Sequence, residues 1–141
     1  MLRATIASVL LATLIGTTSY GQNPDLVPDG VLDCQDIDVL HLLVVLGIYA
    51  PQADFNLDGS VDVLESAIWL QLAGNINLGP GRSYCPGDLN LDGFVDPLDF
   101  IIWNSNRNTP TLWYCTGDID HDGFVGPNDF FIMQLFFGAT C

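Results

Sequence analysis

A twelve-residue acidic segment occurs four times in this chain, and the repeat constrains the fold more than any other feature of the sequence. The four copies align without gaps and start at residues 25, 54, 88 and 118. Each has an acid at position one, Asp-Gly at positions five and six, an aliphatic residue at position eight and an acid at position twelve. Of the 17 acidic residues in the chain, Asp38 is the one outside the four copies. The repeat predicts four copies of one structural unit whose carboxylates gather in a loop.

The spacing of the oxygen-bearing residues matches the needs of a hard cation. Ca²⁺ takes six to eight oxygen ligands, and a twelve-residue loop supplies them from positions one, three, five, nine and twelve and from the backbone carbonyl at position seven. Glycine at position six allows the positive φ that turns the chain around the ion. This is the loop pattern of an EF-hand, and its fourfold occurrence favours calcium binding over a set of solvated Asp-Gly turns.

The four loops differ in the ligands they offer. The second and third loops have a suitable residue at every ligand position, whereas Gly126 at position nine of the fourth loop leaves a place for water. Val27 at position three of the first loop has no side-chain oxygen, so we expect three calcium ions and leave a fourth, in the first loop, open. The predicted ligands are Asp25, Asp29, Val31, Asp33 and Asp36; Asp54, Asn56, Asp58, Ser60, Asp62 and Glu65; Asp88, Asn90, Asp92, Phe94, Asp96 and Asp99; and Asp118, Asp120, Asp122, Phe124 and Asp129.

Only one helix is predicted for each loop. The residues before the loops are interrupted by Pro and Gly and are too few for an entering helix. After the loops, apolar residues predict exiting helices over 36–48, 64–73, 98–106 and 128–137. The acid at position twelve then lies in the first turn of each helix, where a negative charge is favourable.

This loop-plus-one-helix unit, with GDLNLDGFVDPLDF as its clearest copy, resembles the type I dockerin repeat. The resemblance covers nearly all of the chain after residue 21. It implies an all-α fold of tandem loop–helix (F-hand) calcium-binding repeats packed in antiparallel pairs, with the loop residues named above as calcium ligands. Dockerins attach to cohesin modules, which fix enzymes to scaffold proteins or cell surfaces during extracellular polysaccharide degradation. The resemblance therefore implies an attachment module with a cohesin-like or surface partner.

The spacing of the repeats suggests two units, 22–80 and 81–141, with the Gly- and Pro-rich stretch NINLGPGRSYCPG between them. We expect two antiparallel helices in each unit and a short strand-like contact between its two loops at position eight. Pairing of the two inner repeats is the alternative. The helices are apolar on more than one side, so we interpret most of these residues as core and leave open an exposed patch for another protein. The same choice applies to Trp69, Trp103 and Trp113.

The first 21 residues have the features of a secretory signal peptide. Arg3 gives a short positive region, an apolar run follows over 4–16, and Ser19 and Gly21 suit cleavage before Gln22. The run is shorter than the roughly 18–20 residues that span a membrane. We therefore expect a secreted protein, extracellular or at the cell surface, with no membrane span after cleavage.

All four cysteines lie after this segment. An even number in a small secreted chain predicts two disulfides and leaves three connectivities open. In the arrangement above, Cys85 and Cys141 flank the second unit and would join its ends, which leaves Cys34 for Cys115. A zinc site is the rival interpretation, but the chain has no CxxC or HxxxH spacing.

The formal charge of −14 argues against two classes of partner. Nucleic acids and anionic membrane surfaces both attract Lys and Arg, of which the chain has three in total. We do not expect an enzyme, because the carboxylates are better used as metal ligands than as acid–base pairs. His41 is interpreted as a core or rim residue of an apolar helix, and His121, inside a loop, as exposed. Two hypotheses remain: an attachment module, or a calcium-dependent structural protein that self-assembles at a surface or into fibres.

Overall fold

The computed structural model describes residues 23–141, so the predicted signal peptide lies outside the described residues. Within this part the chain forms helices and no strand, which confirms the all-α fold class. No helix among these residues has the length and apolar character needed to cross a membrane. The elements are α2 (Cys34–Leu46), α3 (Val63–Asn77), α4 (Pro97–Asn106), the 3-10 turn η1 (Tyr114–Thr116) and α5 (Pro127–Phe136).

Each helix begins at position ten of the preceding loop, because the loop itself caps it. The position-nine side chains Asp33, Asp62 and Asp96 accept a hydrogen bond from the backbone N–H two residues later, over 2.7–2.8 Å. The acid at position twelve accepts in return from the N–H of position nine, which completes a capping box. The helices therefore start one or two residues earlier than predicted, and the loop and its helix form one hydrogen-bonded unit.

Helix α3 continues four residues beyond its predicted end at residue 73. Gly74, directly after the predicted end, lies inside the helix. A Cβ atom on Gly74 would lie 2.4 Å from Cα of Ser83, so the glycine allows the following chain to pack directly on the helix. The N–H of Tyr84 then donates to the carbonyl of Leu70 over 3.0 Å. Close approach of two backbones, rather than a helix end, accounts for this glycine.

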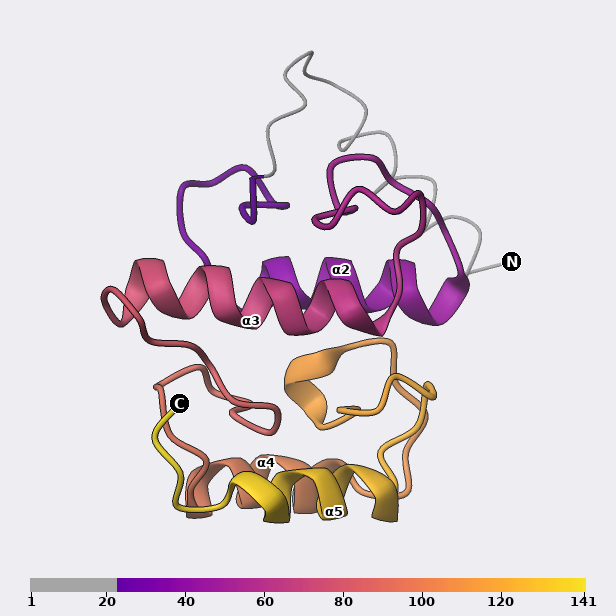
Figure 1. Ribbon diagram of the computed structural model, residues 1–141. Coiled ribbons are helices and arrows are strands. Elements are labelled where there is room, and N and C mark those ends of the chain that lie inside the picture. The colour runs from indigo at the N-terminus through magenta and orange to yellow at the C-terminus, as the bar shows by residue number, and fades with distance from the viewer. Residues whose placement is uncertain (1–22) are drawn as a thin grey trace.

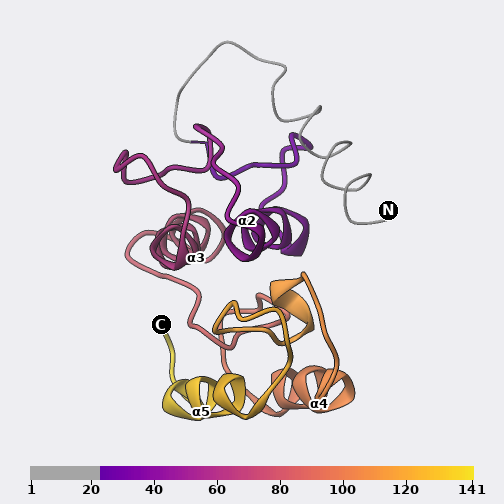
Figure 2. The ribbon, with the colours of Figure 1, turned by 90° about the vertical axis from the view of Figure 1, so that its right-hand side faces the viewer.

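The elements lie in four layers (Figure 1, Figure 2). Helices α2 and α3 run antiparallel and side by side, with the first two loops on one side of them. The third and fourth loops, together with η1, lie on the other side of α2 and α3, and the antiparallel helices α4 and α5 follow beyond them. The α2–α3 pair is therefore covered on both sides, whereas the α4–α5 pair lies at one end of the molecule.

Two of the three tryptophans belong to the core. Trp69 is fully buried and its Nε1–H donates to the carbonyl of Pro24 over 2.8 Å. Trp103 is also buried, and its Nε1–H donates to the carbonyl of Gly126 over 3.2 Å. Trp113 is exposed. A buried indole thus joins α3 to the residue before the first loop, and another joins α4 to position nine of the fourth loop.

Two disulfides link the layers. Cys34 is bonded to Cys115 and Cys85 to Cys141, with Cα–Cα distances of 5.9 and 5.6 Å, and the connectivity considered from the sequence is confirmed. The first bond ties the start of α2 to η1, and the second ties the entry of the third loop to the chain end. No cysteine within 23–141 is free. Two such bonds indicate an oxidising environment, as found outside the cell.

The expected strand-like contact between paired loops is replaced by a different one in the second half of the chain. Phe94 of the third loop forms a bridge with Thr140 after α5, and Phe124 of the fourth loop forms one with Pro110 after α4. Since α4 and α5 are antiparallel, the end of each helix meets the start of the other. The third loop therefore pairs with the residues after α5, and the fourth loop with the residues after α4, instead of the two loops pairing with each other.

Candidate metal centre

The carboxylate at position one organises each loop. One of its oxygens accepts from the backbone N–H of position five and the other from the N–H of position six, over 2.8–3.3 Å. The carboxylate at position five accepts from the N–H of position seven over 2.8–3.0 Å. All four loops share these hydrogen bonds. The predicted ligand residues all belong to the four loops. The position-one residues are Asp25, Asp54, Asp88 and Asp118.

Position four separates the first loop from the others. Leu57, Leu91 and His121 occupy it with φ between 55° and 63°, in the left-handed region. Pro28 stands there in the first loop, and its ring fixes φ near −65°. The first loop therefore differs from the others in backbone as well as in Val27, which adds a reason to expect weaker binding there.

Two loops bring three carboxylates together. In each, one oxygen from each of three residues lies within 4.8 Å of the other two. These clusters could hold a metal ion, since converging carboxylates repel one another unless a cation or proton lies between them. The clusters are Asp54, Asp58 and Glu65 in the second loop, and Asp118, Asp120 and Asp129 in the fourth.

Among the described residues, the first and third loops do not form such a trio of carboxylates, and the residue at position three explains the third loop. Asp99 at position twelve accepts from the N–H groups of Leu89 and Asn90 over 2.7 and 3.2 Å, and Asp129 of the fourth loop accepts in the same way from Ile119 and Asp120 over 2.6 and 3.0 Å. Glu65 is one methylene longer and reaches the other carboxylates. The fourth loop also ends in an aspartate, but it gains a third carboxylate at position three, where the third loop has an asparagine.

Glu65 supplies an observation that favours a cation. Its side chain is fully buried, and Oε2 accepts from the N–H of Asp62 over 2.8 Å. Its Oε1 is buried with no hydrogen-bond partner. Burial raises the pKa of this carboxyl above its ordinary value. A buried carboxylate oxygen without a donor costs free energy, and a metal ion bound beside it would remove that cost.

The third loop shows the same electrostatic problem in another form. Burial, together with the nearby carboxylates of Asp99 and Asp92, raises the pKa of Asp88 to about 7, despite hydrogen bonds from two loop N–H groups. Burial also raises the pKa of Asp129 in the fourth loop. A nearby positive charge would therefore favour full ionisation of Asp88 at neutral pH.

A pair of histidines joins the fourth loop to the helices above it, and sequence reasoning missed this contact. Nε2 of His41 donates to Oδ2 of Asp118 over 3.0 Å, and both side chains are fully buried. The ring of His121 lies 4.4 Å from that of His41, and its Nε2 is 2.8 Å from Oγ of Ser66. Burial and the neighbouring His41 lower the pKa of His121 to about 4.

The interpretation of His41 as a core residue is confirmed, whereas the expectation that His121 is exposed was wrong. The fourth loop does not face solvent at position four, because it lies against α2 and α3. Position four is leucine in the second and third loops, but Leu57 is 73% exposed, so an apolar residue there does not by itself indicate contact. Asp38, the acid outside the loops, has a similar role: it accepts from the N–H of Cys115 over 2.9 Å and ties α2 to η1.

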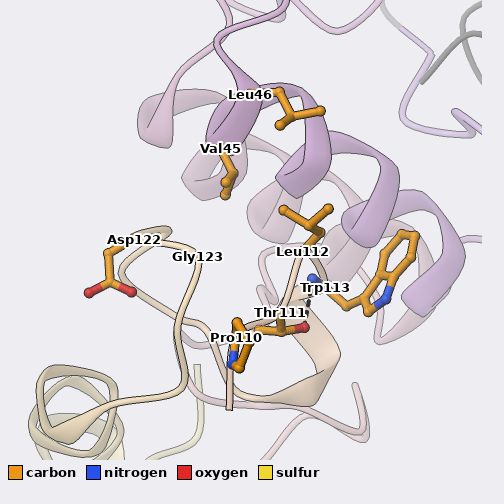
Figure 3. A pocket seen from close by; sticks show the side chains of 8 residues that line it. All are labelled: Val45, Leu46, Pro110, Thr111, Leu112, Trp113, Asp122 and Gly123. Atoms are coloured by element: carbon orange, nitrogen blue, oxygen red, sulfur yellow. Dashed lines mark hydrogen bonds between the residues drawn. The ribbon is translucent and has the colours of Figure 1, made fainter. Parts of the chain in front are cut away.

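An open pocket of about 550 Å³ lies between the end of α2 and the fourth loop (Figure 3). Val45 and Leu46 line it from α2, and the segment 110–113 lines it from below. Its one titratable side chain is Asp122, which belongs to the fourth loop and points away from the apolar side chains of α2. The pocket is therefore an apolar depression beside a loop, without a pair of groups arranged for acid–base chemistry.

No protein-family model, no curated protein and no solved structure matches this chain. The loops, the disulfides and the exposed surfaces of the protein itself therefore carry the evidence for its function.

Proposed function

We propose that this protein is a secreted calcium-binding attachment module that resembles a dockerin and binds a cohesin-like or surface partner. The observation that carries the proposal is the buried carboxylate of Glu65, whose Oε1 has no donor in a loop that otherwise satisfies its polar groups. By the resemblance, the attachment serves extracellular polysaccharide degradation. The two disulfides support an extracellular location.

Calcium is favoured over other metals by the ligand set. The clusters in the second and fourth loops offer oxygen atoms and no thiolate, and hard oxygen ligands suit Ca²⁺. Both ring nitrogens of His121 are hydrogen-bonded, to Ser66 and Ile119, and the clusters themselves contain no imidazole. The ion would supply positive charge to buried carboxylates and so hold each loop on its helix. The third loop, and the first if it binds, would act in the same way.

Self-assembly is the second candidate function, and exposed apolar residues on α4 and α5 favour it. Phe131 and Leu135 on α5 are 61% and 80% exposed, although both are large apolar side chains. An attachment module and a self-assembling protein both need a surface of this kind. The two functions differ in whether the occupant is another protein or a second copy.

Glu65→Gln is expected to have opposite effects on stability with and without calcium. In calcium the variant loses a charged ligand, so we expect the affinity of one site to fall by roughly 100-fold and the protein to be less stable than wild type. In EDTA with both disulfides intact, the amide keeps an acceptor for the capping bond and removes a buried charge, so the variant is more stable than wild type by roughly 1 kcal/mol. Calcium calorimetry and urea unfolding in both conditions measure the two effects.

Asp58→Asn is the matched control in the same loop. Asp58 is exposed and accepts from the hydroxyl and the N–H of Ser60 and from Nδ2 of Asn56, and these bonds hold its pKa below the ordinary value. The substitution should therefore weaken calcium binding without stabilising the metal-free protein. If Glu65→Gln lowered stability equally in calcium and in EDTA, Glu65 would be a helix cap and no metal ligand.

Calcium binding is expected to release protons near neutral pH. The raised pKa of Asp88 means that the metal-free protein is stabilised while this carboxyl is protonated, and that this stabilisation is lost as pH rises from its ordinary value of 3.8 to about 7. Calcium requires the ionised form, so binding at pH 7 should release roughly half a proton from this group. Calorimetry in buffers of different ionisation enthalpy measures the release. A release as large at about pH 9 as at pH 7 would contradict the assignment to Asp88.

A further inference from the structure

The two helix pairs differ in what covers the face turned away from their own loops. On α2 and α3 this face is occupied by the third and fourth loops. His41 on α2 and Ser66 on α3 both contact the fourth loop, and the Cys34–Cys115 bond fixes the contact covalently. The corresponding face of α4 and α5 lies at the end of the molecule (Figure 2), and no described part of the chain covers it.

This uncovered face carries several large apolar side chains, and the uncharged polar residues Asn104, Ser105 and Gln134 on the same helices are exposed as well. The rings of Phe100 and Phe130 lie 5.9 Å apart and connect α4 to α5, and Phe131 lies 6.5 Å from Phe130. Ile101 is adjacent on α4, and Leu135 follows Phe131 by one helical turn. We call this surface the α4–α5 face. Its exposed large side chains are Leu98, Phe100, Ile101, Phe131, Leu135 and Phe137.

The charge distribution indicates what this face can meet. Helices α4 and α5 contain two charged residues, Asp99 and Asp129, and both are buried at the loop side. The rest of a chain with formal charge −14 carries its acids in the loops, on the far side of these helices. A second copy that approached any loop would meet several like charges, whereas one that approached the α4–α5 face with its own α4–α5 face would meet charge only at the ends of α4, where Asp96 precedes the helix and Arg107 follows it.

The size of the face agrees with the needs of a dimer. With about 200 Å² for each large side chain, the exposed fractions of the six residues amount to roughly 700 Å² of apolar surface. A standard stable interface buries about 800 Å² from each partner, including its polar rim. The α4–α5 face can therefore form most of one half of a symmetric interface.

A head-to-tail arrangement is less well supported, because the outer loops lack the residues that dock the inner ones. Tyr84 and Tyr114, each four residues before its loop, are both buried between the layers. Tyr84 bonds Nδ2 of Asn77 on α3, and Tyr114 packs beside His41 on α2. Ala50 stands in the same place before the second loop. The outer loop side of one copy thus has no tyrosine there to place on the helices of the next.

We propose that two copies of this chain associate through their α4–α5 faces in a two-fold symmetric dimer. Ile101 and Leu135 lie in the interface, and the acidic loops of both copies point outward. The proposal deepens the proposed function by naming a second copy as a partner. It rests on that function in one respect: calcium holds the third and fourth loops against α4 and α5. Each interface residue occurs twice in such a dimer, so one substitution acts twice.

Sedimentation velocity in millimolar calcium tests the proposal, with protein purified after export under its own N-terminal segment. We expect a monomer–dimer equilibrium that Ile101→Asp weakens by 100-fold or more in Kd, since the change buries two unpaired carboxylates in an apolar interface. Ile76→Asp is the matched control: Ile76 lies on α3, outside the α4–α5 face, and is 63% exposed against 57% for Ile101. The control variant should keep the wild-type dimer.

Other outcomes overturn the dimer. A wild-type monomer at all concentrations up to about 1 mM, open polymers, or equal weakening by both variants would each exclude it. Calcium titration of Ile101→Asp separates this proposal from the proposed function. Unchanged calcium affinity in this variant would show that it is folded and that its loss of dimerisation arises at the interface. A wild type that binds calcium but stays monomeric would reject the dimer alone, whereas absence of calcium binding in wild type would reject the proposed function itself.

Discussion

Removal of calcium with EDTA is expected to unfold the protein once its disulfides are reduced, with loss of most of the helical circular dichroism signal. The helices begin inside the loops, since the side chains at positions nine and twelve cap them. Loops three and four also form the layer that joins the two helix pairs (Figure 1). Disruption of the loops therefore removes the caps and the contact between the pairs at the same time, so that folding and metal binding become one equilibrium.

The expected size of this effect is comparable to the whole stability of a small domain. Calcium at 100 times its Kd stabilises the folded protein by about 2.7 kcal/mol at each site. Three occupied sites would then contribute roughly 8 kcal/mol, within the 5–15 kcal/mol typical of native proteins. The disulfides close segments with sequence separations of 81 and 56 residues. In the chain-entropy account each contributes about 4 kcal/mol, so the oxidised protein should keep residual structure in EDTA.

Circular dichroism and urea unfolding of oxidised and reduced protein, each with calcium and with EDTA, measure these contributions. Addition of excess calcium to the chelated sample is the control and should restore the signal. Magnesium alone should restore less of it, because Mg²⁺ demands tighter octahedral geometry and loses its water reluctantly. An unchanged helical signal in EDTA after reduction would show that the loops are held by their hydrogen bonds alone.

Much of the fold could be predicted from the sequence because each repeat is a local structure. A loop and its helix depend on residues no more than about twelve positions apart, such as Asp33 capping α2 and Asp36 returning to it. The four helices therefore lie where the loop pattern places them. The end of α3 was mispredicted, because the role of Gly74 depends on Ser83 of the following segment, which packs against the helix. Local propensity contains no information on that contact.

Contacts between the layers were harder to predict for the same reason. The buried hydrogen bond between His41 and Asp118 joins residues 77 positions apart, and no sequence pattern in either segment predicts it. One signal was present in the sequence: Tyr-Cys precedes the third and the fourth loop, as Tyr84-Cys85 and Tyr114-Cys115, and precedes neither of the outer loops. Both tyrosines are buried and both cysteines are bonded. A motif confined to two of four repeats marks the two loops that pack against the rest of the chain.

Asp118→Asn is expected to cost both a metal site and the contact between the fourth loop and α2. Oδ2 of Asp118 accepts from the N–H of Gly123 over 2.8 Å and from His41 over 3.0 Å, while Oδ1 accepts from the N–H of Asp122. An asparagine has one oxygen and one NH₂ group, so at least one of these donors would face another donor. Because His41 is fully buried, its unsatisfied N–H cannot turn to water. We expect the oxidised, metal-free variant to be less stable than wild type by roughly 2–3 kcal/mol.

Asp54→Asn separates the loss of a metal site from the loss of the contact with α2. Asp54 is at position one of the second loop, as Asp118 is in the fourth, but no histidine bonds to it. Its oxygens accept from the N–H groups of Asp58 and Gly59 over 3.1 and 3.0 Å, as in the fourth loop, and its further contact is with Tyr49 over 3.4 Å. Both variants should lose one calcium site in calorimetry, but only Asp118→Asn should show the larger loss in EDTA. His41→Leu in each background provides the cycle: its cost should fall sharply once Asp118 is changed and stay the same once Asp54 is changed. Equal costs in both backgrounds would mean that the His41–Asp118 contact contributes nothing, and that packing around the loop alone joins the two helix pairs.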